Sequence, residues 1–188
     1  MPITFVVLIA QLAAANIGAC ADHPAEWNVG AGVAKSVNLY QSTAGRNYAV
    51  QTIGWSKSVG PEMAPGVARG CFAWGVEAMP LFLQFNPTNI YGVGMAPLVW
   101  RWNLVPRRRW SAFAELSMGA LWTSDPIPDK TSRLNFSAHW GAGIRLRPRG
   151  ANAWLLAYRF QHFSNGNQFS SNPGVNSHVF LAGWSHRS

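Results

Sequence analysis

The sequence predicts an eight-stranded antiparallel β-barrel that spans an outer membrane and is preceded by a cleavable signal peptide. Three observations support this prediction. The chain begins with an apolar export segment, its later apolar residues alternate with a period of two, and turn-forming residues divide these stretches into eight spans. With 188 residues, 10 Trp, 10 Phe and 12% charged residues, the chain also has the aromatic-rich composition of a protein that faces lipid.

The N-terminal segment has the features of a signal peptide. Residues 3–15 form an apolar run of suitable length, and Ala19-Cys20-Ala21 is a small-residue cleavage pattern ahead of Asp22. We therefore expect residues 1–21 to be removed and residues 22–188 to form the barrel domain. No other run has the about 18 uninterrupted apolar residues of a membrane helix. A closed barrel is then the remaining way for the chain to cross a bilayer.

Cys20 allows a second interpretation of this segment. Ile17-Gly18-Ala19-Cys20 also resembles a lipoprotein cleavage site, which would keep Cys20 as a lipid anchor. Cleavage after Ala21 would instead leave Cys71 as the single cysteine of the mature chain, and no internal disulfide is then expected.

The strand prediction is clearest over residues 110–122 and 133–147. In both spans apolar residues occupy alternate positions, so that one face suits lipid and the other suits a lumen. The apolar face consists of Trp110, Ala112, Ala114, Leu116, Met118, Ala120 and Trp122 in the first span, and of Leu134, Phe136, Ala138, Trp140, Ala142, Ile144 and Leu146 in the second.

Turn signals divide the rest of the chain into spans of similar length. Pro80 and Pro97 interrupt two of these spans, and we expect each proline at a bulge or a strand end. The complete set of predicted strands is 26–36, 47–58, 70–85, 89–105, 109–123, 133–147, 152–164 and 176–186.

The connections differ in length and charge. If both termini lie in the periplasm, the short basic connections 105–110 and 148–153 face inward, whereas the outward loops are polar and rich in turn formers. An eight-stranded barrel has a lumen filled by side chains and is therefore not a pore. We expect the outward loops at 37–46, 86–89, 124–132 and 165–175, and a structural lumen network of Glu77, Arg101, Glu115, His139, Arg145 and Arg159.

Two polar residues fall on the lipid-facing side of the predicted strand 152–164. Continuing its alternation places His162 and Ser164 on the same face as Phe160, with Arg159 and Gln161 in the lumen. A polar group left unsatisfied there costs about 1–3 kcal/mol, which suggests that this pair has a use.

The pair has the chemistry of an ester hydrolase. His162 can take the proton of Ser164 as the hydroxyl attacks an ester carbonyl, and can return that proton to the leaving alcohol. The oxyanion needs hydrogen-bond donors nearby. The following loop offers Asn165, Asn167 and Asn172, together with backbone amides at Gly166.

The segment Arg159-Phe160-Gln161-His162-Phe163-Ser164-Asn165, followed by Asn172-Pro173-Gly174-Val175-Asn176, resembles the signature of the PagL-type lipid A deacylases. Members of that family are eight-stranded outer-membrane barrels that hydrolyse the ester-linked acyl chain at position 3 of lipid A. The resemblance implies that His162 is the general base and Ser164 the nucleophile. It also implies oxyanion donation by Asn172 and by a backbone amide near Gly166.

The sequence departs from the family pattern at Asn176, where the best-known members carry the Glu that orients the histidine. An amide oxygen can still accept the imidazole N–H, as Asn does in Cys-His-Asn proteases. It brings no charge to stabilise the imidazolium, which favours slower turnover. The C-terminus, which ends in His186-Arg187-Ser188, also lacks the terminal aromatic residue common in such barrels.

The predicted function is therefore an outer-membrane serine esterase that acts on lipid A without a metal or cofactor. The net charge of +8 does not indicate nucleic-acid binding, because the basic residues cluster in short turns. Arg46, Lys130 and Arg133 are candidates for contact with the phosphates of lipid A. A homodimer is not excluded. The alternative function is a non-catalytic barrel with a structural or adhesive role; a palmitoyl transferase would need an acceptor site inside the barrel.

Overall fold

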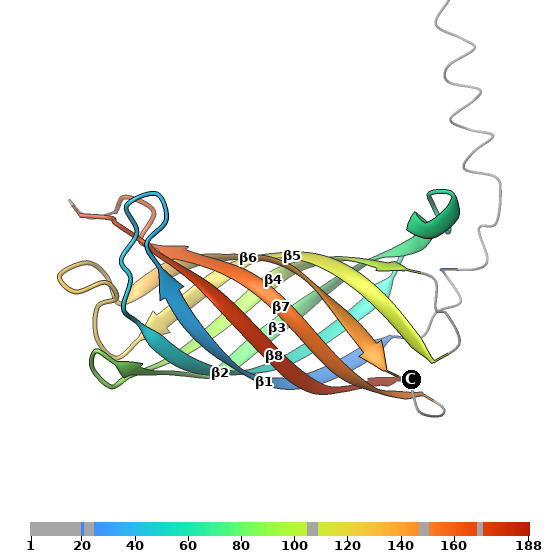
Figure 1. The fold of residues 1–188 in the computed structure, drawn as a ribbon, viewed down its shortest axis with the longest axis horizontal. Coiled ribbons are helices and arrows are strands. Elements are labelled where there is room, and N and C mark those ends of the chain that lie inside the picture. The colour runs from blue at the N-terminus through green and yellow to red at the C-terminus, as the bar shows by residue number, and fades with distance from the viewer. Residues whose placement is uncertain (1–19, 21–24, 105–108, 147–150, 169–170) are drawn as a thin grey trace, which may run out of the picture.

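The computed structural model is a closed barrel of eight antiparallel strands in sequence order, with β1 paired to β8 (Figure 1). It describes Cys20 and residues 25–104, 109–146, 151–168 and 171–188. The predicted fold class is confirmed, and every strand boundary lies within one residue of its prediction. The strands are β1 (Glu26–Val37), β2 (Asn47–Ser58), β3 (Gly70–Asn86), β4 (Ile90–Leu104), β5 (Trp110–Thr123), β6 (Leu134–Leu146), β7 (Asn152–Ser164) and β8 (Val175–Arg187).

The two ends of the barrel differ. The end on the left of Figure 1 carries the loops that follow β1, β3, β5 and β7, and we call it the loop end. The opposite end, here the terminal end, holds the C-terminus, where the Ser188 N–H donates to the Ala25 carbonyl. The terminal end also carries a short 3-10 helix, Gly66–Ala68, which the sequence analysis did not expect. No helix among the described ranges is long and apolar enough to cross a membrane. The predicted signal peptide, apart from Cys20, and most of the two basic turns lie outside the described residues.

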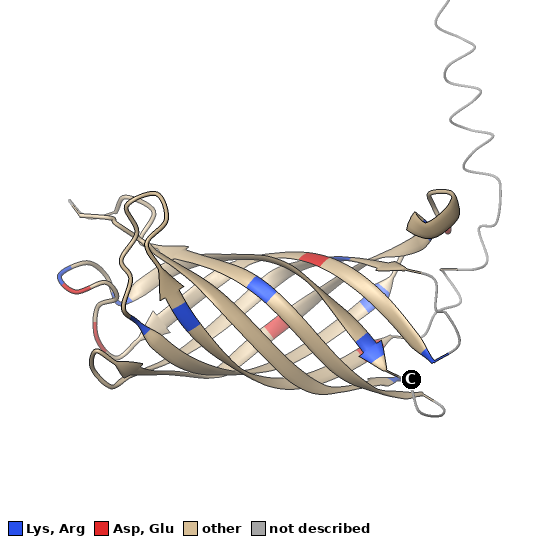
Figure 2. Cartoon of the chain, in the orientation of Figure 1, with Lys and Arg blue, Asp and Glu red and all other residues tan. Residues whose placement is uncertain are grey.

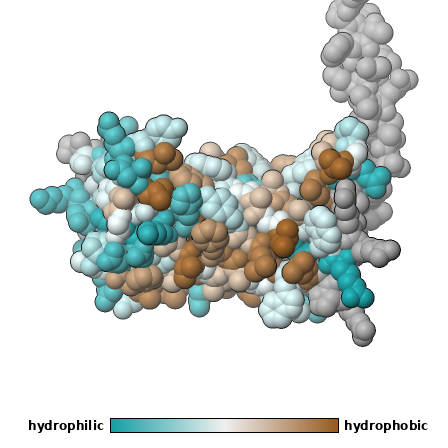
Figure 3. Space-filling view, in the orientation of Figure 1, coloured by the Kyte–Doolittle hydropathy of each residue, from teal (hydrophilic) through white to brown (hydrophobic). Residues whose placement is uncertain are grey.

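The outer wall is apolar between the two ends, as the alternation predicts. Exposed Trp27, Trp110 and Trp154 lie toward the terminal end, and exposed Tyr91 and Trp122 lie toward the loop end. Figure 3 shows hydrophobic residues along the side of the barrel and hydrophilic residues over the loops. Aromatic residues at both edges of an apolar band are typical of outer-membrane barrels, because their rings suit the membrane interface.

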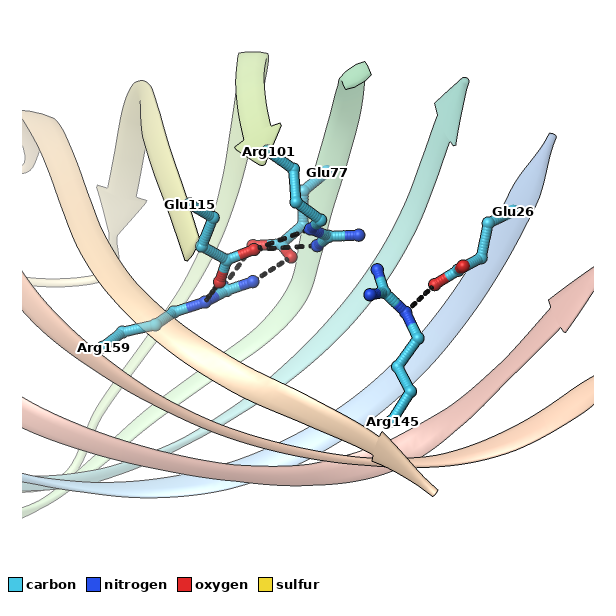
Figure 4. Close-up of polar contacts among 6 residues, drawn as sticks. All are labelled: Glu26, Glu77, Arg101, Glu115, Arg145 and Arg159. Carbon is cyan, nitrogen blue, oxygen red and sulfur yellow. Dashed lines mark hydrogen bonds and ion pairs between the residues drawn. The ribbon is translucent and has the colours of Figure 1, made fainter. Parts of the chain in front are cut away.

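Arg159 is the centre of a charged network in the lumen (Figure 4). Its guanidinium lies 2.7 Å from a carboxylate oxygen of Glu77 and 2.6 Å from one of Glu115. Glu115 also accepts two hydrogen bonds from Arg101. Charged residues within the strands (Figure 2) thus neutralise one another inside the barrel, as predicted for these four side chains.

A second lumen pair joins Arg145 to Glu26 at 2.7 Å, and the sequence analysis had not named Glu26. Arg101 and Arg145 also lie over the ring of Phe113, with guanidinium carbons 4.8 and 4.4 Å from its centroid. His139 is in the lumen as predicted, but within the described part of the chain its ring nitrogens have no hydrogen-bond partner. The prediction of a polar network therefore holds for the arginines and glutamates and not for His139.

Aromatic side chains fill the lumen toward the loop end. The rings of Tyr48 and Phe82 are 4.8 Å apart, and those of Phe82 and Phe163 are 6.2 Å apart. The Tyr48 hydroxyl donates to Gln161 Oε1 at 2.8 Å. This packing lies directly behind the loop-end part of β7, so it supports the wall on which His162 and Ser164 lie.

Both prolines lie where the strand pairing is irregular, as predicted. The register between β3 and β4 shifts between Met79 and Phe82, around Pro80. The register between β4 and β5 shifts between Met95 and Leu98, around Pro97. A residue without a backbone N–H is tolerated at such bulges because no ladder hydrogen bond is required of it.

The cysteines correct one expectation. Cys20 and Cys71 form a disulfide with Cα atoms 5.6 Å apart, whereas Cys71 was expected to have no partner. The expectation assumed cleavage after Ala21, which would remove Cys20. In the full chain Cys20 is present and pairs with Cys71, and the position of signal-peptide cleavage stays a prediction.

The lumen network predicts a large loss of stability when Arg159 is replaced. Arg159→Ala leaves Glu77 without its ion-pair partner and removes one partner of Glu115. Because an uncompensated buried charge is costly, we expect the variant to lose about 3–5 kcal/mol of its free energy of unfolding. The loss is measured by unfolding in urea, followed by tryptophan fluorescence. Arg133→Ala is the control, because that side chain is 57% exposed and 3.9 Å from Asp125. Equal losses in the two variants would contradict a structural role for the network.

Candidate active site

The candidate site lies on the outer wall at the loop end, where β7 ends and β8 begins. In β7, Gln161 and Phe163 are buried in the lumen. His162 and Ser164 alternate with them along the strand and point outward. His162 is paired in register with Asn176 of β8. Since directly opposite residues in a sheet share a face, Asn176 also points outward. The period of two therefore brings His162, Ser164 and Asn176 to one patch of the wall.

Asn176 orients the imidazole of His162. Its Oδ1 lies 2.7 Å from His162 Nδ1. Its Nδ2 donates to the carbonyl oxygen of Leu39 at 2.8 Å, which fixes the direction of the amide because a carbonyl only accepts. We therefore assign the His162 proton to Nδ1. His162 Nε2 is then an acceptor, which is the form that a general base requires.

Gly174 packs against both His162 and Ser164. A Cβ atom added to Gly174 would lie 2.9 Å from His162 Cε1 and 3.5 Å from the Cβ of Ser164. The glycine backbone, with a φ of 63°, therefore packs against both side chains. Among the residues that the structure describes, Ser164 Oγ makes no hydrogen bond. The hydroxyl is thus available to a partner in the patch.

Three asparagines organise the loop that follows Ser164. The backbone N–H of Asn165 donates to Asn172 Oδ1 at 3.0 Å, and Asn172 Nδ2 donates to Asn167 Oδ1 at 2.8 Å. The Asn165 side chain accepts from the Asn167 N–H and donates to the Ser171 carbonyl. Asn165 is 1% exposed, so its side chain is engaged within the loop.

Two donors in this loop keep unused hydrogens. Gly166 lies over the ring of Phe136, which its missing Cβ allows, and its backbone N–H has no acceptor in the described part of the loop. Asn172 Nδ2 carries a second hydrogen besides the one given to Asn167. Both groups lie within the loop that starts at Ser164.

An apolar groove of about 600 Å³ opens beside His162. Trp140 and Phe160 line it as a tilted ring pair with centroids 4.7 Å apart. A second cavity of about 810 Å³ shares Tyr158 with the groove. The groove beside the site is lined by Leu39, Tyr40, Ala138, Trp140, Tyr158, Phe160, His162, Pro173 and Asn176.

The three candidates for phosphate contact have different surroundings. Arg46 is 3% exposed and donates to Gln84 inside the barrel and to Asp129, so the expectation of an exposed contact is wrong for this residue. Lys130 and Arg133 are exposed in the loop that follows β5. No group of three or more His, Cys, Asp or Glu side chains that could hold a metal ion occurs among the described residues.

A sequence model of the family described as lipid A 3-O-deacylase (PagL) matches residues 44–185, which include His162, Ser164 and Asn176. The chain belongs to this family. The deacylase is accordingly an outer-membrane barrel that hydrolyses the ester-linked acyl chain at position 3 of lipid A. No curated protein sequence matches the chain.

Solved structures share the fold of the deacylase. The crystal structure of the outer membrane enzyme PagL has a TM-score of 0.62 and 18% sequence identity, covering 83% of this chain and 97% of that one. Neisserial surface protein A has a TM-score of 0.56 and 11% identity, with 87% and 97% covered. The outer membrane protein OprG from Pseudomonas aeruginosa has a TM-score of 0.51 and 8% identity, with 88% and 97% covered.

The sequence analysis missed two parts of the patch. Gly174 belongs to the motif, and its place between Pro173 and the predicted last strand was a signal of a tight turn that packs closely against its neighbours. Leu39 takes part through its backbone carbonyl, which any residue has, so no sequence pattern indicates it. The contact depends on the loop after β1 lying beside the start of β8.

Asn176 has a measurable effect if it orients His162. We expect Asn176→Ala to lower kcat on micellar lipid A about ten- to a hundredfold, or about 1.4–2.7 kcal/mol. Asn176→Glu should match or modestly exceed the parent, within about threefold. The carboxylate strengthens the bond to the imidazolium and loses the bond to Leu39. Undiminished turnover of the Ala variant would remove Asn176 from the mechanism and leave a dyad.

Proposed function

We propose that the deacylase is a serine esterase in which Ser164 is the nucleophile, His162 the general base and Asn176 the residue that orients the base. The observation that carries this proposal is the 2.7 Å contact between His162 Nδ1 and Asn176 Oδ1. It leaves Nε2 as the free acceptor on a ring that Gly174 packs against together with Ser164. Three polar side chains gathered on a lipid-facing wall carry a cost in free energy, which supports a functional role for them.

In the proposed acylation step, Ser164 Oγ bonds to the ester carbonyl carbon while its proton passes to His162 Nε2. The tetrahedral oxyanion accepts hydrogen bonds from the Gly166 N–H and from Asn172 Nδ2. Collapse breaks the bond between the carbonyl carbon and the sugar oxygen, and His162 returns the proton to that oxygen. Water then attacks the acyl-Ser164 ester with the same base and releases a fatty acid.

The loop residue Asn165 has a positioning role in this proposal. Its side chain accepts from the Asn167 N–H and its backbone N–H donates to Asn172, so it holds the turn that presents the oxyanion donors. Pre-positioned donors stabilise the transition state without reorganisation when the charge develops. Asn165 is thus expected to act through Asn172 and Gly166.

The apolar groove beside His162 supports the binding of the acyl chain. Its lining is mostly aromatic and aliphatic, and it reaches from the patch toward the middle of the wall. Since the 3-position ester lies where the sugar meets the hydrocarbon, a chain in this groove brings its carbonyl to the loop end. This placement requires that the loop end faces the outer leaflet.

The catalytic assignment is tested by Ser164→Ala. We expect the variant to fold as a barrel and to lose deacylation of lipid A, measured by mass spectrometry of the lipid A product. Ser137→Ala, on the facing strand β6, serves as the matched control and should keep activity. Activity retained in Ser164→Ala would point to another nucleophile, and a parent protein without activity would favour the non-catalytic alternative.

The acyl groove is tested by filling it. Ala138 lines the groove opposite His162, so Ala138→Phe should lower kcat/KM for lipid A about tenfold or more. Hydrolysis of a short-chain ester in neutral micelles should change little, because a short chain does not need the groove. Ala114→Phe, at an exposed position on β5, is the control. Equal losses on both substrates would contradict chain binding in this groove.

The orientation is tested with a membrane-impermeant maleimide on intact cells. Lys130→Cys places a thiol on an exposed position at the loop end, and Val67→Cys places one at the terminal end, where Val67 is 79% exposed. We expect labelling of the first variant in intact cells and of the second only after lysis. The reverse pattern would place the site in the periplasmic leaflet.

A further inference from the structure

A second polar group interrupts the apolar outer wall beside the site. Phe160 of β7 is paired in register with His178 of β8, His178 with Lys35 of β1, and Lys35 with Asn47 of β2. All four point outward, because their neighbours along each strand are buried in the lumen. A polar row therefore consists of His178, Lys35 and Asn47. It lies two residues along the strands from the row that holds His162 and Asn176, on the side away from the loop end.

Lys35 is a cation without a counter-ion. It lies two residues before the end of β1, so it is close to the loop end of the wall. No carboxylate within the described ranges forms an ion pair with it. An ammonium group on a lipid-facing wall is costly unless its flexible stem reaches the interface or an anion neutralises it. At this position the stem of Lys35 can carry its ammonium group to the membrane surface, where it is available to an anion.

His178 is held so that one ring nitrogen faces away from its neighbours. The Tyr158 hydroxyl lies 2.6 Å from His178 Nδ1, and the His178 ring stacks on Tyr158 at a centroid distance of 5.8 Å. We assign the shared proton to the Tyr158 oxygen, because a neutral imidazole nitrogen is a better acceptor than a phenol oxygen, and this assignment puts the imidazole proton on Nε2. That N–H has no acceptor among the residues described and is a second donor beside Lys35.

We propose that Lys35 and His178 bind a phosphate group of the lipid A substrate and so hold the scissile ester over Ser164. This inference rests on the proposed function of the patch. Directly opposite residues in a sheet have Cβ atoms about 4.5–5.5 Å apart, so one phosphate can accept hydrogen bonds from both side chains.

Lys35 lies two strands away from His162 and two residues further along its strand from the loop end. Strands are about 4.8 Å apart and residues two apart are about 6.5–7 Å apart, which places the phosphate about 10–12 Å from the reacting carbonyl. A phosphorylated sugar bridges a gap of this size. The acyl groove is lined from β6 and β7, from the start of β8 and from the loop after β1, and neither Lys35 nor His178 is among its lining residues. The chain and the phosphate therefore contact different side chains.

The experiment compares lipid A with the same lipid A after enzymatic removal of its phosphates, in neutral detergent micelles. Lys35→Ala should lower kcat/KM about tenfold on the phosphorylated substrate, mainly through KM, and should not change it on the dephosphorylated one. Lys35→Arg should keep most of the activity, and His178→Phe, which preserves the ring packing, should lose several-fold. Lys57→Ala is the matched control, because Lys57 is an outward lysine at the terminal end of β2 and should have no effect.

A binding measurement separates this inference from the catalytic proposal. In a Ser164→Ala background, Lys35→Ala should raise the Kd for phosphorylated lipid A about tenfold, whether or not Ser164 is the nucleophile. Equal effects on both lipids, or none on either, would overturn the phosphate site. So would a Lys35 effect that appears only after an anionic phospholipid is added, because Lys35 would then hold a bulk lipid headgroup.

Discussion

The pairing of β1 with β8 is the constraint on which the rest of the molecule depends. A strand edge in lipid would leave a row of backbone groups without hydrogen bonds, and closure removes that edge. The same pairing brings the end of β1 beside the start of β8. The Leu39 carbonyl can then fix the Asn176 amide, and Lys35 stands next to His178. Closure therefore stabilises the fold and also completes the surroundings of the site.

The two faces of each strand have different roles: the lumen side stabilises the barrel, and the outer side carries the candidate site. Inside, Arg159 ties Glu77 and Glu115 together and Tyr48, Phe82 and Phe163 pack tightly, which makes the wall rigid. Outside, polar groups are placed on an apolar surface at a cost in free energy. A rigid support lets the site hold His162 and Asn176 at a fixed separation on strands, where positions are more precise than on loops.

In the proposed mechanism, Asn176 is a neutral group that orients the general base. A carboxylate would bring charge to the imidazolium, and it would also place that charge beside the Leu39 carbonyl and the lipid. The amide accepts from the imidazole with its oxygen and donates to Leu39 with its nitrogen. This sequence thus exchanges charge stabilisation for a fixed orientation of the histidine and a contact with the loop after β1.

The sequence by itself determined the features that a period of two can specify. It located each strand, put Arg159 in the lumen and put His162 and Ser164 on the lipid side, because each side chain's face follows from its place in its own strand. Tertiary structure decided what depends on contacts between distant segments. It paired Cys20 with Cys71, turned Arg46 inward to Gln84, and set Leu39 and Lys35 beside β8. Those contacts depend on how the barrel closes and how its loops fold back, and alternation along one strand carries no information about either.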